Sequence, residues 1–179
     1  VDAADVNKIV VSRFEEAFNN PIYRTEDGGR SWTRIGGDKA PRELHPDVPW
    51  WPLRYFSSAT SAIALDPHQP GRLFLTDWFG TWHTPDVWAD TTHWYTSQKG
   101  HEETVPLMLA SPPEGVPLFT LVADVSGFRH ESLEEYPLKR ITRGNEGIDI
   151  AFCYTQPDYM ALIDATSWSS DNTRFITSS

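Results

Sequence analysis

The sequence predicts an all-β fold built from repeated antiparallel sheets, and two observations lead to this prediction. Residues 61–77 (SAIALDPHQPGRLFLTD) form an apolar run, a polar turn with proline, and a second apolar run, which is typical of a β-hairpin. Sustained 3.6-residue periodicity is almost missing, because the two candidate segments, 12–20 and 132–140, are short and Pro137 interrupts the second. We therefore expect short strands with at most a helical turn.

The hairpin pattern occurs four times along the chain. Residues 2–12 align with 66–76, so the first copy begins in the middle of a hairpin, and further copies occupy 107–122 and 148–164. Repeats of about 40 to 50 residues made of short strands are typical of β-propeller blades, each a four-stranded antiparallel sheet. The sequence therefore predicts about three to four blades, a fragment of a propeller.

The spacing of the copies locates an insertion. Anchors at residues 2, 66, 111 and 153 are 64, 45 and 42 residues apart, so the first interval is the longest. We assign the extra residues to 43–58, which are rich in proline and aromatic side chains, and inserted loops of this kind often line a propeller's binding face. The expected organisation is one partial propeller domain over residues 1–179, truncated at both ends, with hairpin turns near 67–71, 113–116 and 155–158.

Composition excludes several classes of partner. Among the 179 residues, 25 acidic and 15 basic side chains give a net charge of −10, so neither a phosphate backbone nor an anionic membrane attracts the chain. We expect no nucleic acid and no membrane partner. No apolar run is long enough for a membrane span, and the N-terminus lacks the basic region of a signal peptide. The single cysteine, Cys153, cannot form an internal disulfide, and we expect it to be buried.

Residues 25–32 (TEDGGRSW) fit the Asp-box pattern Ser/Thr-x-Asp-x-Gly-x-x-Trp. Asp27 can accept N–H groups of the turn, glycines at 28 and 29 tolerate positive φ, and Trp32 can tuck under the hairpin. We therefore assign Thr25, Asp27, Gly29 and Trp32 a structural role and expect no catalysis by Asp27. Because the motif occurs in propellers of several functions, it indicates architecture and not chemistry.

Three linked blocks narrow the choice. They are GHEETV (100–105), LASPPEGVPL (109–118) and ADVSGFRH (123–130), and they resemble the stretch G-x-E-E, L-x-S-P-P-x-G-x-P-L, G-D-x-x-G-F-x-H of glycoside hydrolase family 74. A tryptophan-bearing loop before an I-A-x-D-P-x-x-P hairpin also resembles that family's second propeller domain. The resemblance covers roughly residues 20–179. It implies two seven-bladed propellers that face each other across a cleft and hydrolyse β-1,4-glucans, chiefly xyloglucan, with inversion.

By its place in the third block, Asp124 corresponds to the residue that the resemblance implies as general acid, although Ala123 replaces the usual Gly. The residues themselves support this modestly, because 116–124 is an apolar strand that ends in a lone acid. The alternative is a turn-initiating Asp. The partner base belongs, in the family, to the first propeller, which this chain does not contain, so we expect the isolated chain to be inactive. Glu102 and Glu103 are a further acidic pair, for which a structural or rim role is favoured.

Aromatic and histidine residues complete the candidate site. Flat indole faces suit the apolar C–H surface of sugars, so we name Trp50, Trp51, Trp78 and Trp82, with His130, as candidate substrate-binding residues; blade packing is the alternative for each tryptophan. We expect residues 43–58 and 78–95 on one face, near the strand end that carries Asp124, with His130 as a polar neighbour. The six histidines occur singly in the sequence, so neither a metal site nor a cofactor is predicted.

Two further functions stay open at this stage. A non-catalytic Asp-box propeller that binds a glycan or a protein would need the blades and aromatic residues but no acid at position 124. A sialidase would need an arginine cluster and a nucleophilic tyrosine, for which the sequence shows no pattern. For the favoured glycosidase we expect a polysaccharide or oligosaccharide substrate of the xyloglucan type, a missing N-terminal propeller of the same protein as partner, and a secreted location.

Overall fold

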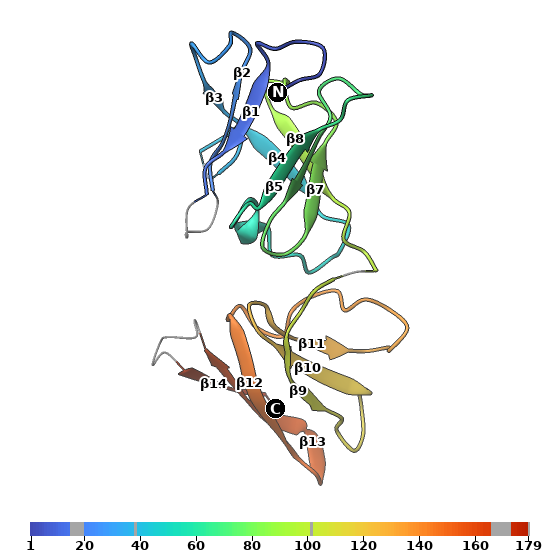
Figure 1. Ribbon diagram of the computed structural model, residues 1–179. Helices are drawn as coiled ribbons and strands as arrows, with labels where there is room; N and C mark the ends of the chain where they lie inside the picture. Colours follow the sequence, from blue (N-terminus) through green and yellow to red (C-terminus); the bar gives the residue numbers. More distant parts are fainter. Residues whose placement is uncertain (15–19, 38, 101, 166–172, 179) are drawn as a thin grey trace. The chain divides into compact units, whose positions relative to one another are not determined.

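The computed structural model describes residues 1–14, 20–37, 39–100, 102–165 and 173–178. They form an all-β chain in two compact units, Val1–Glu103 and Thr104–Ser179 (Figure 1). Each unit has its own sheets. The prediction of an all-β fold is confirmed, and among the described residues the only helical segment is the 3-10 turn η1 (Leu53–Tyr55), which lies in the aromatic insertion.

The first unit contains two sheets. One has the antiparallel order β1 (Ile9–Ser12), β2 (Ile22–Thr25), β3 (Thr33–Arg34). The other has the order β4-β8-β7-β6-β5, in which β5 (Ala62–Leu65), β6 (Leu73–Thr76), β7 (Thr81–Thr84) and β8 (Thr92–Thr96) form an antiparallel meander.

The edge strand β4 (Arg42–His45) departs from the expected pattern, because it lies parallel to β8. Parallel neighbours need a long connection, and here the whole meander separates the two strands in sequence. The expectation of purely antiparallel sheets is therefore wrong at this edge. The expectation of four strands in each sheet is also wrong for the described residues, in which three sheets have three strands and this one has five. The first residues of the predicted insertion, 43–45, extend a sheet instead of interrupting one.

The core of the first unit is aromatic. Alternation along β6, β7 and β8 buries Leu73, Leu75, Trp82 and Trp94 on one face of the sheet. Phe56, from the insertion, meets Trp82 edge-on with ring centroids 5.1 Å apart and lies 5.2 Å from Trp94. The insertion thus folds back and covers this face of the sheet.

The second unit contains two antiparallel sheets. They are β9 (Pro106–Ala110), β10 (Leu118–Val122) and β11 (Ser126–His130), and β12 (Glu146–Cys153), β13 (Gln156–Ala165) and β14 (Thr173–Ser178) (Figure 1). Side chains from both sheets meet in one core of Val116, Phe119, Leu121, Ile150 and Leu162. Face-to-face packing of successive hairpin sheets is how propeller blades bury their apolar surface.

The hairpin turns lie close to their predicted positions. Residues 66–72 join β5 to β6, 111–117 join β9 to β10, and 26–32 join β2 to β3, as expected. The turn predicted at 155–158 lies earlier, at 154–155, because Gln156 already pairs with Cys153. The third predicted turn is therefore displaced by a longer strand β13.

The first copy of the repeat has the turn geometry of the second. The Asp2 N–H donates to the Lys8 carbonyl at 2.8 Å, and the Asp66 N–H donates to the Arg72 carbonyl at 2.9 Å. These pairs are the ones that the alignment of 2–12 with 66–76 matches. The alignment therefore pairs residues with the same local structure.

Three other expectations can be compared with the structure. Cys153 is exposed, so the expectation of burial is wrong: alternation along β12 buries Ile150 and turns Cys153 to the outer face. Residues 132–140 form no helix, and residues 15–19 of the other candidate helix, 12–20, lie outside the described part.

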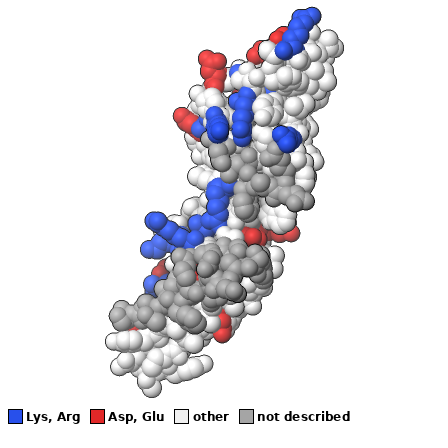
Figure 2. All heavy atoms as spheres, turned by 90° about the vertical axis from the view of Figure 1, so that its left-hand side faces the viewer, with Lys and Arg blue, Asp and Glu red and all other residues white. Residues whose placement is uncertain are grey.

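The face in Figure 2 carries both basic side chains (Lys or Arg) and acidic side chains (Asp or Glu), although the net charge of the chain is −10. None of the described helices is long and apolar enough to cross a membrane.

Candidate active site

Asp124 lies in the tight turn between β10 and β11. The Val125 N–H donates to the Ala123 carbonyl at 2.8 Å, which closes a three-residue turn centred on Asp124. Asp124 and Ser126 have φ of 66° and 71°, a region that costs a non-glycine residue about 1–3 kcal/mol. Such strained positions gather at functional sites. The half-buried acid thus ends an apolar strand in a strained turn.

Glu146, the first residue of β12, lies beside this turn and is 1% exposed. Its Oε2 accepts a hydrogen bond from the Asp124 N–H at 3.1 Å, and its Oε1 has no hydrogen-bond partner among the described residues. Burial raises the pKa of the Glu146 carboxyl, and the charges of Asp124 and Asp164 raise it further. Hydrogen bonds from the Asp124 N–H and the Asn145 side chain oppose this rise.

Asp164 on β13 is the third carboxyl residue here, and it is fully buried. The Thr142 hydroxyl donates to its Oδ2, and the Ser126 and Thr142 hydroxyl oxygens are 2.6 Å apart. A Cβ at Gly144 would stand 1.7 Å from Asp164 Oδ1, so only glycine fits. These contacts hold the loop before β12 against the Asp124 turn. Sequence reasoning missed Glu146 and Asp164, because each shares its strand with a second, exposed acid, Asp149 or Asp158, and no local pattern shows which of the two is buried.

His130 does not lie beside Asp124. It pairs with Leu118 at the far end of the β10–β11 hairpin, four strand residues beyond Ser126, which corresponds to about 13 Å. Its Nε2 is 2.9 Å from the Thr120 hydroxyl oxygen, and burial lowers the pKa of the imidazole. The expectation of a polar neighbour to Asp124 is therefore wrong. The His130 side chain lies beside Thr120 on the β10–β11 hairpin, and the role of His130 in substrate binding stays a prediction.

The acidic pair at 102–103 does not open a strand, since β9 begins at Pro106. Glu102 Oε1 accepts the Gly100 N–H at 3.1 Å, a local turn contact. The two acids end the first unit and Asp124 belongs to the second, so a rim role for Glu102 and Glu103 stays a prediction.

Most of the candidate sugar-stacking residues are buried in the first unit. Trp50, Trp51 and Trp82 are 9%, 7% and 1% exposed, and Trp51 meets Trp82 edge-on at 6.4 Å. Their burial favours the packing alternative. Trp78, the second residue after β6, is 66% exposed and presents its indole to solvent. Because these residues and Asp124 belong to different units, the expectation of a common face stays a prediction.

Sequence reasoning also missed Asp77, the residue that follows β6. Its Oδ1 accepts the N–H groups of Phe79 and Gly80 at 3.0 and 3.1 Å, and its Oδ2 accepts the Ser57 N–H at 3.0 Å and the Trp82 indole N–H at 2.8 Å. Burial raises the pKa of Asp77 to about 6, although these four donors lower it. Asp77 therefore ties the aromatic insertion to the sheet.

A signal for Asp77 was present in the sequence. The spacing Asp-x-x-Gly-x-x-His occurs at 77–83 and again at 124–130. In both cases the acid lies in the turn of a hairpin, between β6 and β7 or between β10 and β11. The environments differ: three backbone N–H groups and one indole N–H satisfy Asp77, whereas Asp124 sits at the centre of its own strained turn.

The 25–32 turn is held by its own side chains. Asp27 accepts the Ser31 N–H at 2.9 Å and the Ser31 hydroxyl at 2.6 Å, and the Thr25 hydroxyl at 2.7 Å. The Ser31 and Thr25 hydrogen bonds hold the pKa of Asp27 well below its usual range. Gly29 has a φ of 91°, and the Trp32 indole N–H donates to its carbonyl at 3.1 Å. Trp32 remains 44% exposed, so it covers Gly29 only in part.

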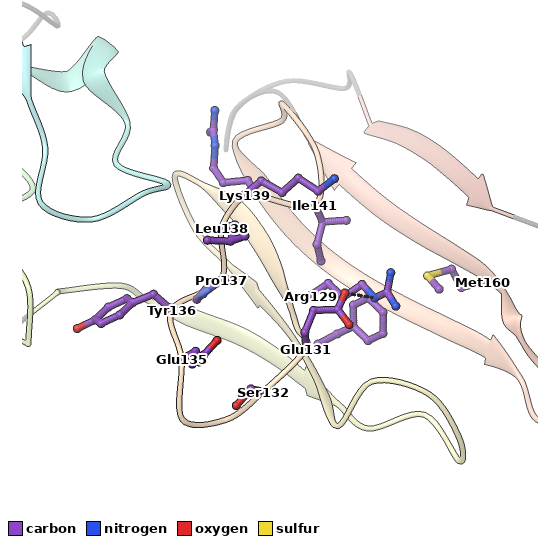
Figure 3. Close-up of a pocket in the computed structure, with 12 residues that line it drawn as sticks. Arg129, Glu131, Ser132, Glu135, Tyr136, Pro137, Leu138, Lys139, Ile141 and Met160 are labelled. Carbon is purple, nitrogen blue, oxygen red and sulfur yellow. Dashed lines mark ion pairs between the residues drawn. The ribbon is translucent and has the colours of Figure 1, made fainter.

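A pocket of about 430 Å³ lies in the second unit, between the segment 131–141 and the sheets (Figure 3). Its apolar lining includes Phe119, Ile141 and Met160, and the Arg129–Glu131 ion pair, 3.3 Å apart, stands at its rim. This volume lies in the range of small-molecule sites. Asp124 does not line it, so the described pocket and the Asp124 turn are separate features.

Sheets of this order, packed in pairs, define the chain as blades of a β-propeller. No family model matches the sequence. A xyloglucanase of Paenibacillus sp. is 26% identical, over 96% of this chain and 19% of that protein. A probable oligoxyloglucan-reducing end-specific xyloglucanase of Neosartorya fischeri is 33% identical, over 63% of this chain and 18% of that protein.

The solved structures agree. The GH74 xyloglucanase of Xanthomonas campestris superposes with a TM-score of 0.81 at 26% identity, and the match covers 99% of this chain and 26% of that one. The chain is thus similar, in sequence and in structure, to glycoside hydrolase family 74 over nearly all of its length. It spans about a fifth of the curated relatives that it matches.

Proposed function

We propose that this chain is part of a glycoside hydrolase that cleaves the β-1,4-glucan backbone of xyloglucan-type polysaccharides, with Asp124 as the general acid. The observation that carries the proposal is the Asp124 turn. A half-buried acid ends an apolar strand in a strained conformation, and a second, buried carboxyl group, Glu146, binds its N–H. The xyloglucanase relatives supply the substrate class.

An inverting hydrolysis needs two carboxyl groups about 6.5–9.5 Å apart. One gives a proton to the glycosidic oxygen while the bond from that oxygen to C1 breaks. The other takes a proton from water while the water oxygen bonds to C1 from the opposite face. We assign the first role to Asp124 and place the base in another propeller of the full-length protein, as the family resemblance implies.

Glu146 has a different role in this proposal. At 1% exposure it cannot touch a polysaccharide, and its Oε2 instead holds the Asp124 N–H. Glu146 is therefore a positioning residue, which fixes the backbone from which Asp124 projects.

The test is Asp124→Asn in the full-length protein, because Asn keeps the shape but delivers no proton. General acid catalysis typically contributes about 10²–10⁴-fold to the rate. The turnover of xyloglucan should therefore fall by a factor of about 10²–10⁴ or more. A substrate with an activated aryl leaving group should lose much less, since its departure needs little protonation. Asp149→Asn, which changes an exposed acid of β12, should leave turnover unchanged. Full turnover of unactivated xyloglucan by Asp124→Asn would show that another group is the acid.

The alternative is a non-catalytic propeller that binds a glycan. The exposure of Trp78 favours some contact of this kind, because an indole that is 66% exposed offers a flat apolar face to a sugar ring. Trp78→Ala should then weaken the binding of xyloglucan oligosaccharides in calorimetry, whereas Trp78→Phe should retain part of it. If the full-length wild type binds these oligosaccharides but does not hydrolyse them, the binding function replaces the hydrolase.

A further inference from the structure

The parallel pairing of β4 with β8 brings together two histidines that lie 48 residues apart in the sequence. The register pairs Glu43 with His93 and His45 with Tyr95. Side chains alternate along a strand, so Glu43 and His45 share one face of β4, and His93 is on the same face of β8. This is the face opposite the buried Trp94. The three side chains are 58%, 39% and 43% exposed and are open to solvent.

Three donor atoms of these residues form a small triangle. His45 Nε2 lies 3.3 Å from His93 Nδ1, His93 Nδ1 lies 3.3 Å from Glu43 Oε2, and His45 Nε2 lies 3.7 Å from the same oxygen. Zinc binds imidazole nitrogen at about 2.0–2.1 Å and carboxylate oxygen at about 2.0–2.2 Å, in tetrahedral geometry. Two ligands at these lengths on one tetrahedral ion stand about 3.3 Å apart. The observed triangle therefore has the size that one ion requires.

The histidine rings are oriented by stacking. His45 stacks on Tyr95 with ring centroids 4.6 Å apart and an interplanar angle of 17°, and the His93 ring faces the edge of the His45 ring, nearly parallel to it at 15° with centroids 5.6 Å apart. On the other side of Tyr95, His83 stacks at 5.6 Å. A ligand whose ring is held in place loses little freedom on binding a metal. His83 belongs to the same stack but contributes no atom to the triangle.

We propose that Glu43, His45 and His93 form a binding site for a divalent transition-metal ion, with zinc as the best match. Two imidazoles and one carboxylate are ligands that suit zinc, whereas calcium and magnesium prefer shells made of oxygen atoms alone. The three side chains occupy three positions of a tetrahedron, and the exposed side leaves the fourth to water. No local spacing in the sequence predicts this site, because Glu43 and His45 are only two residues apart but His93 lies 48 residues beyond His45.

The same contacts have a competing explanation, in which one protonated imidazole pairs with Glu43 and no metal binds. Calorimetry with zinc chloride on the tag-free chain, after treatment with a chelator, separates the two. We expect one zinc ion per chain and a rise in the melting temperature. Cobalt(II) at the same site should give the visible absorption of a tetrahedral ion, which reports the geometry independently of affinity. Absence of zinc binding by the folded wild type overturns the proposal.

The variants are chosen to separate ligands from neighbours. His93→Ala and His45→Ala should each weaken zinc binding more than tenfold, since loss of an outer-shell partner alone costs about 10–100-fold. Glu43→Gln, which keeps the shape, should also weaken binding and change the cobalt spectrum. His83→Ala removes a ring from the same stack and should leave the affinity unchanged. Circular dichroism of each variant checks folding. If His83→Ala weakens binding as much as His93→Ala, the stack and not the triangle is responsible, and the assignment of ligands is wrong.

Discussion

Replacing Asp77 by Asn should destabilise the first unit and change how its stability depends on pH. Asn keeps one acceptor oxygen, which can serve the N–H groups of Phe79 and Gly80. Its NH₂ group then faces two donors, the Ser57 N–H and the Trp82 indole N–H. If the amide of the variant rotates by 180°, its oxygen serves the Ser57 and Trp82 donors instead, and the Phe79 and Gly80 N–H groups lose their acceptor. Each buried donor without an acceptor costs about 1–3 kcal/mol, so the loss is about 2–6 kcal/mol.

The pH dependence follows from the raised pKa of Asp77, about 6 in the folded chain against 3.8 for an aspartate in water. The folded state holds this proton more tightly than the unfolded state, so the stabilisation is full below 3.8 and is lost as the pH rises through about 6. At pH 7 the buried charge costs about 3 kcal/mol relative to the protonated form, of which about 2 kcal/mol appears between pH 4.5 and 7. Asn does not titrate, so the variant lacks this change.

Urea unfolding at pH 4.5 and pH 7 measures both effects. Tryptophan fluorescence is a suitable probe, because seven of the eight tryptophans lie in residues 1–103. The wild type should be more stable than Asp77→Asn, and its advantage in the free energy of unfolding should be about 2 kcal/mol larger at pH 4.5 than at pH 7. This double difference cancels the titration of all other groups that do not contact Asp77. An equal difference at the two pH values would refute the reasoning that burial raises the pKa of Asp77.

Three further outcomes are expected. Asp27→Asn should lower the melting temperature at neutral pH but much less in strong acid, because a depressed folded pKa gives stability that is lost as the pH falls; an equal loss at every pH would contradict this. In urea unfolding, Trp82→Ala should cost about 3–5 kcal/mol and Trp78→Ala less than about 0.5 kcal/mol, and similar losses would show that the aromatic core is misplaced. Cys153, exposed and with its pKa lowered by hydrogen bonds from Thr155, should react with a thiol reagent in the native protein as fast as in denaturant; slow native reaction would show burial.

The sequence alone determined the architecture. Period-two apolar runs separated by Pro and Gly turns specify hairpins locally, since the alternation and the turn residues act within a few positions of each other. For that reason the sequence could predict the turns at 66–72 and 111–117 and the hydrogen bonds inside 25–32. Asp124 was placed at a strand end by the same local logic.

Only the tertiary structure decided which distant side chains meet. Glu146 and Asp164 reach the Asp124 turn because two sheets pack face to face, and no local pattern encodes that approach. The burial of Trp82 depends on the insertion folding over the sheet. His45 meets His93 because β4 joins the sheet edge in parallel, a pairing fixed by the path of the chain between strands and not by the residues of either strand.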